Sequence, residues 1–273
     1  MSMSAALGAP EEAGVGGAVL WFCMRANILL PAAAVLLAVS ATAPGAKHTS
    51  WRDIESRIQY GYYTEDAAAL RSLRGLIAAD ESRDRLHGYY AALLAWREAQ
   101  LAAQATPASR GAAAGDLAQR CVTEADQALE ANAAFADLLA VRAACLATPL
   151  DPGGASLSSR RARKDIERAL KAAPHDPRVL LVEAMNDYQL APPDGNKERA
   201  LPKLRHTVAA FETERAGLER LPGWGAAESY LFLAQDLLDH ADPVGARDAL
   251  EHALLIAPEF AQARRLMASI VSG

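Results

Sequence analysis

A short phrase recurs along the chain at nearly regular intervals, and this recurrence constrains the fold more than any other feature. Its Ala-Leu pairs begin at Ala128, Ala169 and Ala253, which lie 41 and then 84 residues apart. A period of about 42 residues, with one divergent copy between the last two, accounts for both intervals. A unit of that length suits two helices and their loops, so the sequence predicts a stack of helical hairpins.

The composition also favours helices. Of the 273 residues, 51% are apolar but only 6% are aromatic, and alanine supplies most of the difference. Alanine has the highest helix propensity, whereas the β-branched and aromatic runs typical of strands are scarce. So much apolar side chain argues against a disordered chain. We therefore expect an all-α protein of roughly eleven antiparallel helices.

The sharpest copy of the repeat covers residues 227–258. Asp242 and Pro243 form a pair that is typical of the end of one helix and the start of the next. On either side of this pair, apolar residues recur at the spacing of one helix face. These stripes are Tyr230, Leu233, Ala234 and Leu237 before the turn, and Ala246, Leu250, Ala253 and Leu254 after it.

In this copy the chain resembles the tetratricopeptide repeat (TPR). The eight signature positions of that motif are all matched in the right spacing, by Tyr230, Leu233, Ala234, Leu237, Ala246, Leu250, Ala253 and Pro258. The resemblance implies a TPR-like superhelix, an α-solenoid, formed by residues 47–273 as a single domain. The other copies are degenerate, since Arg142 stands where the motif has leucine, a Gly- and Ser-rich insertion follows at 151–156, and residues 47–110 diverge.

The rest of the chain is expected to form further helices of the same stack. The expected ranges are 51–62 and 64–79 as an opening hairpin, 84–103, helices around Cys121–Leu129, Arg142 and Ala162–Leu170, then 178–190, 197–216 and a closing helix at 259–271. Seven aromatic residues gather between Trp51 and Trp96, where we expect them to pack the opening hairpin on the first long helix; the alternative is a sticky binding surface. The phrase at 222–228 resembles exported bacterial TPR proteins, and this resemblance implies architecture rather than activity.

The first 46 residues are interpreted as a leader. Residues 24–46 run from a short basic start through an apolar stretch at 28–41 to small residues, the order of a secretory signal peptide. Residues 1–23 make a poor start for such a signal, so we interpret them as untranslated or as an unusual extension. The alternative is an uncleaved N-terminal membrane anchor, because 15–43 could nearly span a bilayer. We expect export to the periplasm or cell envelope, with membrane contact only through an uncleaved leader.

Two cysteines follow the leader. Cys121 and Cys145 lie in successive predicted helices, each 12 residues from a turn near Ala133, so they stand at the same height in an antiparallel hairpin. A disulfide also requires Cα atoms within about 7 Å of each other. The sequence leaves a disulfide and two small buried thiols as alternatives, and an oxidising compartment would permit the disulfide.

The sequence offers no motif for catalysis, metal binding or phosphate binding. The six histidines are scattered, and none of the common zinc, nucleophile-elbow, phosphate-loop or Cys-x-x-Cys patterns occurs. A net charge of −5 argues against a general affinity for nucleic acid. A basic cluster at Arg160, Arg161, Arg163 and Lys164 precedes acidic residues and is interpreted as a solvated helix face, with an anionic partner as the minority alternative. We expect no enzyme activity and no cofactor.

The TPR resemblance implies a concave surface lined by the first helix of each repeat. The residues implied for this surface are Arg178, Leu181, Met185, Tyr188 and Gln189 in one repeat, and Glu228, Leu231, Gln235, Leu238 and Asp239 in the next. This mixture of apolar and polar side chains suits an extended peptide or a helix.

We interpret the chain as a non-enzymatic protein- or peptide-binding repeat scaffold of the periplasm or cell envelope, whose oligomeric state stays open. One alternative is an apolar small-molecule-binding TPR component of an envelope transport system, with Leu181, Met185, Leu231 and Leu238 around the ligand. Another is an enzyme or enzyme accessory whose site leaves no motif. A dry, enclosed cavity would favour a small ligand, and an open shallow groove would favour a peptide.

Overall fold

The computed structural model describes residues 50–80, 84–104, 107–148, 155–190, 195–215 and 221–272. The chain divides into two units, Met1–Gly45 and Ala46–Gly273, and the described residues all belong to the second. Every regular element in these ranges is an α-helix, which confirms the predicted all-α class. The leader predicted at 1–46 lies outside the described residues. Within the described ranges, no helix combines the length and the apolar character needed to cross a membrane.

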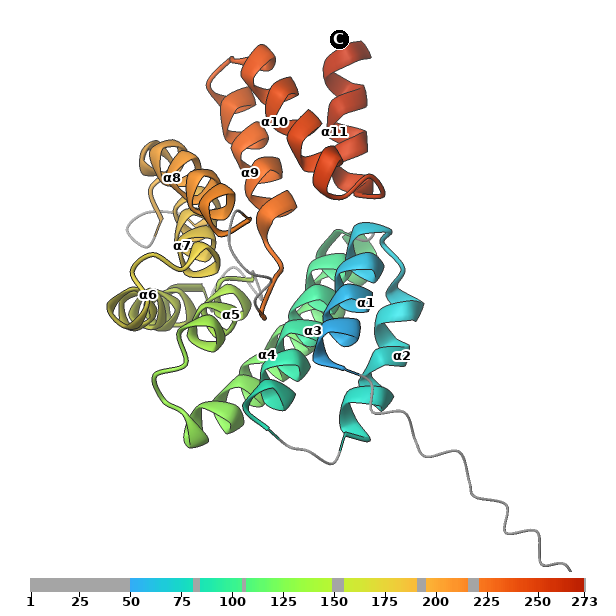
Figure 1. Cartoon of the computed structure of the whole chain (residues 1–273), viewed down its shortest axis with the longest axis vertical. Coiled ribbons are helices and arrows are strands. Elements are labelled where there is room, and N and C mark those ends of the chain that lie inside the picture. The colour runs from blue at the N-terminus through green and yellow to red at the C-terminus, as the bar shows by residue number, and fades with distance from the viewer. Residues whose placement is uncertain are drawn as a thin grey trace, which may run out of the picture. The chain divides into compact units, whose positions relative to one another are not determined.

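Eleven helices follow one another in the described part of the chain (Figure 1). They are α1 (Trp51–Tyr63), α2 (Ala67–Ala78), α3 (Arg85–Gln104), α4 (Pro107–Ala131), α5 (Ala136–Ala147), α6 (Ala155–Ala172), α7 (Pro177–Gln189), α8 (Lys197–Arg215), α9 (Ala226–Asp239), α10 (Pro243–Ile256) and α11 (Ala261–Ser272). These bounds agree closely with the helices expected from the sequence.

Helix starts lie where a side chain can accept a hydrogen bond from the first free N–H groups. Asp176 precedes α7 and Asp242 precedes α10, and each carboxylate accepts from a backbone N–H two or three residues further on, at 2.9 Å. Pro177 and Pro243 follow as the first helical residues, where a missing N–H leaves no hydrogen bond unmade. The Asp-Pro pairs therefore set both helix starts.

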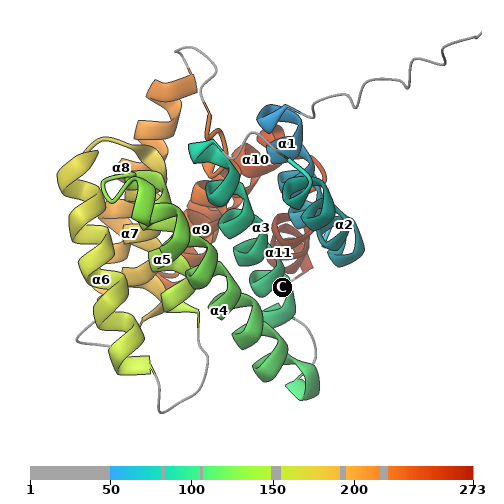
Figure 2. The same ribbon diagram turned by 90° about the horizontal axis from the view of Figure 1, so that it is seen from below.

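Neighbouring helices pack as hairpins, and the hairpins touch through their odd-numbered members. The closest pairs are α3 with α4, α5 with α6, α7 with α8, and α9 with α10, while α3 contacts α5, α5 contacts α7, and α7 contacts α9. Figure 2 shows α1–α4 and α5–α8 on opposite sides of the view from below. This is the neighbour pattern that stacked hairpins produce, whereas the superhelical geometry of a TPR solenoid stays a prediction.

Small residues lie where paired helices cross most closely. Ala234 in α9 and both Ala246 and Ala253 in α10 are fully buried. In the first large hairpin, Gly88 of α3 faces Ala128 of α4, and a Cβ at Gly88 would come within 2.5 Å of the Ala128 Cβ. The alanine surplus in the sequence therefore reflects close helix packing.

The two cysteines are joined across the α4–α5 hairpin. Cys121 and Cys145 form a disulfide with their Cα atoms 6.2 Å apart, and both residues are fully buried. Of the two arrangements that the sequence left open, the structure has the disulfide. It fixes α4 to the helix that leads into the middle of the described unit.

The first helices also contact the last ones. Tyr62 and Tyr63 of α1 pack against Phe260, which precedes α11, with ring centroids 5.9 and 4.6 Å apart. Between α8 and α9, Trp224 packs edge-on against Trp96 of α3 with centroids 5.2 Å apart. The aromatic residues of the N-terminal region therefore mostly pack the interior, as expected, although Tyr60 is exposed.

Candidate binding groove

The inner side of α7 and α9, where the sequence implied an open concave surface, is largely filled. Arg178, Leu181, Met185, Glu228 and Leu231 are all less than 5% exposed. The cause is that α1, α3 and the segment before α9 pack over this side. An open surface made of all ten predicted residues is therefore wrong for this structure.

Glu228 illustrates how that side is occupied. Its carboxylate accepts hydrogen bonds from Arg97 of α3 and, at 2.8 Å, from the Tyr63 hydroxyl of α1. Arg97 also donates to the Gln59 side chain at 3.2 Å and lies over the ring of Tyr62, 4.2 Å from its centroid. Buried charges are stable only when they are paired and hydrogen-bonded in this way.

A second buried acid lies nearby on α1. Glu55 accepts hydrogen bonds from the Tyr90 hydroxyl at 2.6 Å and from the backbone N–H of Gly223 at 2.7 Å. Burial raises the pKa of Glu55 above its ordinary value, although these hydrogen bonds act in the opposite direction. We call Glu55, Gln59, Tyr63, Tyr90, Arg97 and Glu228 the central cluster.

The other five predicted residues lie at the edge of the α7–α9 contact. The Tyr188 hydroxyl donates to Asp239 at 2.7 Å, and the Lys197 ammonium contacts the same carboxylate at 2.6 Å. These two hydrogen bonds, that of Lys197 foremost, hold the pKa of Asp239 below its ordinary value. Gln189 is exposed and Gln235 and Leu238 are half-buried. This group forms a small polar rim without a cavity that any described residue outlines.

The apolar ligand set predicted as an alternative is not arranged around a cavity. Leu181, Met185 and Leu231 belong to the hydrophobic core, and Leu238 packs against its C-terminal part. Neither of the two cavities described below is lined by these four residues.

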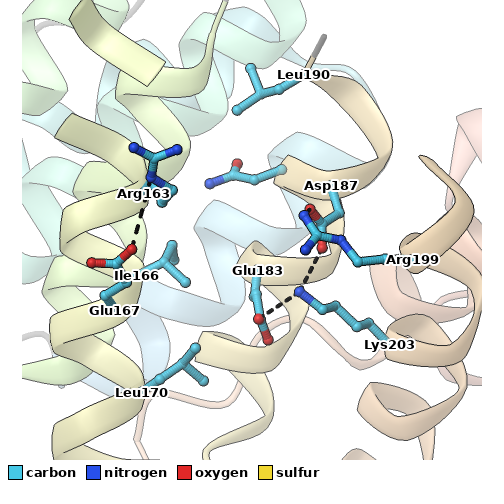
Figure 3. Close-up of a pocket in the computed structure, with 10 residues that line it drawn as sticks. Arg163, Ile166, Glu167, Leu170, Glu183, Asp187, Leu190, Arg199 and Lys203 are labelled. Atoms are coloured by element: carbon cyan, nitrogen blue, oxygen red, sulfur yellow. Dashed lines mark hydrogen bonds and ion pairs between the residues drawn. The ribbon is translucent and has the colours of Figure 1, made fainter. Parts of the chain in front are cut away.

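A groove of about 350 Å³ lies elsewhere, between α6, α7 and α8 (Figure 3). We call it the outer groove. It is lined by Arg163, Ile166, Glu167 and Leu170 from α6, Glu183, Asn186 and Asp187 from α7, Leu190 after α7, and Arg199 and Lys203 from α8. In Figure 3 the α6 and α8 side chains lie on opposite sides of α7.

Helical spacing explains why these residues share one cavity. Residues four apart lie on the same helix face, as Ile166 and Leu170 do on α6 and as Arg199 and Lys203 do on α8. The opposite face of α6 is used for packing, because Ala162 and Ala169 are fully buried. The groove is thus the space left between two amphipathic helices above the polar side of α7.

Ion pairs cross the groove from α8 to α7. The Lys203 ammonium lies 2.6 Å from Glu183 and 2.5 Å from Asp187, and Arg199 lies 3.3 Å from Asp187. Burial alone would lower the pKa of Lys203, but its hydrogen bonds to Asp187 and Glu183 outweigh burial and raise the pKa. Lys203 therefore stays protonated and neutralises the acids of α7.

The chemistry of the groove is that of recognition. It offers apolar contact from Ile166, Leu170 and Leu190 beside charged groups of both signs. Its histidine-free lining contains no nucleophile paired with a base, which covalent catalysis would need. Across the described residues, no group of three or more His, Cys, Asp or Glu side chains is placed to hold a metal ion.

A smaller cavity of about 90 Å³ lies between α2, α3 and α4. Arg74 and Glu98 form a two-point ion pair at its edge, with distances of 2.6 and 2.7 Å. His87 is also in the lining and lies 3.7 Å from Asp80. The size of this cavity allows a few water molecules rather than a peptide.

Sequence reasoning missed the outer groove because it followed the repeat motif to the inner face. Only Arg163 of the predicted basic cluster lines it, and that cluster was interpreted as a solvated helix face. A usable signal was present in the basic residues of 160–171 and in Arg199 and Lys203, which share a helix face.

Comparison with known proteins yields one distant structural neighbour. No protein-family model matches the chain, and no curated protein matches it. The solved structure of the HusA haemophore from Porphyromonas gingivalis is similar to it, with a TM-score of 0.55 and 18% sequence identity over 71% of this chain and 96% of that chain. At this identity the likeness concerns the fold alone, and the chain shares an all-helical fold with that haemophore.

Proposed function

We propose that this chain is a non-enzymatic binding protein that holds a segment of a partner protein in the outer groove. The observation that carries the proposal is the lining itself, in which Ile166, Leu170 and Leu190 lie among charged side chains of both signs. Peptide-binding grooves between helices use the same combination, in which apolar contacts supply affinity and polar groups fix orientation.

The size and openness of the groove fit a few side chains of a longer segment. A volume of about 350 Å³ is at the lower end of ligand pockets, which span roughly 300–1,000 Å³. The walls are the exposed sides of α6 and α8, so a bound segment could continue past both ends. A helix or an extended peptide lying between α6 and α8 meets these conditions.

Export remains part of the proposal. It rests on the signal-peptide pattern at 24–46 and is supported by the Cys121–Cys145 disulfide, because disulfides persist mainly in oxidising compartments. The partner is therefore expected in the periplasm or cell envelope.

Site-specific photo-crosslinking tests this function. A photoreactive amino acid at Glu167 or Leu190 should yield a discrete crosslinked adduct in cells, because both positions border the groove. The matched control is the same amino acid at Val244 of α10, which is 79% exposed and far along the chain from the groove. Adducts of equal yield at all three positions would contradict a specific site.

A small-molecule function is the second candidate, and one specific observation favours it. The similar solved structure is that of a haemophore, a protein that by its name carries haem, and 96% of that chain is covered. Haem combines an apolar ring with two carboxylates, and the outer groove combines apolar residues with Arg163, Arg199 and Lys203.

Titration with ferric haem separates the two candidates. A haem carrier should give a saturable one-to-one shift of the Soret absorbance, and Leu170→Glu should abolish the shift if the outer groove is the site. A peptide-binding protein should show only weak, non-saturating haem association that Leu170→Glu leaves unchanged.

A further inference from the structure

Exposed charge on α6 is strongly unbalanced. Of its seven exposed charged residues six are basic, and these are Arg160, Arg161, Arg163, Lys164, Arg168 and Lys171, against Glu167. The remaining acid of the helix, Asp165, is buried and accepts two hydrogen bonds from Arg142 of α5, at 2.7 and 2.8 Å. Because the whole chain carries a net charge of −5, this positive face is a local feature.

Contacts with neighbouring acids neutralise little of this charge. Arg163 lies 3.8 Å from Glu167, and Arg161 lies 3.8 Å from Asp126, both at the outer limit of an ion pair. Exposed pairs of this kind contribute little and exchange readily with solvent or with a partner. The basic side chains of α6 therefore remain open to an acidic group from outside.

The two walls of the outer groove differ in this respect. On the α8 wall, Lys203 and Arg199 are held by Glu183 and Asp187 of α7, so that wall is close to neutral. On the α6 wall, the apolar pair Ile166 and Leu170 is bordered by the unneutralised basic face. A partner that lies in the groove meets apolar surface on one side of its axis and positive charge on the other.

We infer that the segment bound in the outer groove is acidic and amphipathic. Its apolar side chains contact Ile166, Leu170 and Leu190, and its carboxylates face the basic residues of α6. This inference rests on the proposed function, because it names the partner chemistry of the same groove. An anionic membrane surface fits less well, because the apolar residues of α6 lie inside a groove, where a flat bilayer does not reach them.

Selection from a random peptide library tests the inference. A phage-displayed library of 12-residue peptides is selected on the purified full-length protein, and the enriched peptides are synthesised and their affinities measured. Enrichment of Asp and Glu together with large apolar residues is expected. The double variant Lys164→Glu/Lys171→Glu should bind these peptides at least about tenfold more weakly, because it replaces attraction by repulsion at two positions.

The matched control changes the net charge equally at a distance. Arg71→Glu/Arg264→Glu alters two exposed basic residues on α2 and α11, and it should change affinity less than about twofold. Lys164 and Lys171 are exposed and have no ion-pair partner among the described residues, so their substitution leaves the fold intact.

Each outcome decides between the two levels of the argument. Enriched peptides that are neutral or basic, or equal affinities in both double variants, overturn the acidic partner but keep the groove, provided that Leu170→Glu abolishes binding. No enrichment beyond that obtained on the Leu170→Glu variant overturns the proposed function as well. Binding to vesicles rich in phosphatidylserine, lost in Lys164→Glu/Lys171→Glu while no peptide is enriched, assigns the basic face to a membrane instead.

Discussion

The central cluster and the outer groove both contain paired charges, but only one of them keeps its charges away from water. Arg97 and Glu228 are 1% and 2% exposed, whereas Arg199 and Lys203 in the groove are 60% and 30% exposed. The same residue types therefore serve different purposes. Buried pairs hold distant helices in one arrangement, and half-exposed pairs leave a surface that a partner can enter.

The difference follows from where the partners lie in the sequence. The pair of Arg97 and Glu228 spans 131 residues and joins α3 to α9. The pairs of Lys203 with Glu183 and Asp187 span 20 and 16 residues within one hairpin. Loss of the first kind separates parts of the fold, while loss of the second kind alters only a local surface.

Breaking the buried pair should have the largest effect. Arg97→Met leaves Glu228 without its cation in the interior, and such a change costs about 3–5 kcal/mol of unfolding free energy. Urea denaturation followed by circular dichroism measures the loss. The double variant Arg97→Met/Glu228→Leu removes both charges and should recover part of it.

The control for this prediction is an exposed pair that also joins distant helices. Glu65 and Arg265 form an ion pair near the surface across 200 residues of sequence. Glu65→Gln should cost no more than about 1 kcal/mol. If both variants lose equal stability, sequence distance rather than burial determines the strength of these pairs, and the comparison drawn above is wrong.

The disulfide gives the next largest effect. Cys121 and Cys145 are separated by 24 residues, and closing a loop of that size stabilises the folded state by about 3 kcal/mol. The variant Cys121→Ala/Cys145→Ala should lose about this much unfolding free energy but keep its groove affinity, because neither cysteine lines the groove. A stability equal to that of the wild type, together with two free thiols in the native protein, would contradict the disulfide.

The sequence predicted the helices well and the site poorly, for physical reasons. Helix positions depend on local signals such as Asp242-Pro243 and the alanine stripes, which survive in a single sequence. The filling of the inner face depends on contacts such as Tyr63 with Glu228 and Trp224 with Trp96, which join residues more than 120 positions apart. No local pattern reports such contacts.

The repeat motif itself contributed to the error. It identified Glu228 and Arg178 as exposed charges on a binding surface, because charged residues are usually solvated. Both are buried, where Arg178 forms a two-point ion pair with Glu214 at 2.9 and 2.6 Å. A motif states which helix face is turned inward, but it does not state what else packs there.

A groove variant should have a smaller effect on stability than on binding. Lys203→Met removes the cation shared by Glu183 and Asp187, and because Lys203 is 30% exposed the expected loss is about 1 kcal/mol or less. The uncovered acids of α7 should then repel an acidic peptide. Urea denaturation and peptide titration on the same sample compare the two effects. A loss as large as that of Arg97→Met would show that the groove is part of the core.

The smallest expected effect is a difference in pH dependence between Glu55 in the centre and Asp239 at the rim. Burial raises the pKa of Glu55, so its stabilising contribution is complete below the unfolded pKa and is lost as pH rises through the folded value. The pKa of Asp239 is lowered, so its contribution is present above the unfolded pKa and is lost as pH falls through the folded value. Relative to wild type, Glu55→Gln should therefore gain unfolding free energy as pH rises from about 4 to 7, while Asp239→Asn should lose it as pH rises from about 2 to 5. Urea denaturation of the three proteins across this range measures both slopes, and slopes of the same sign would show that the two acids share one environment.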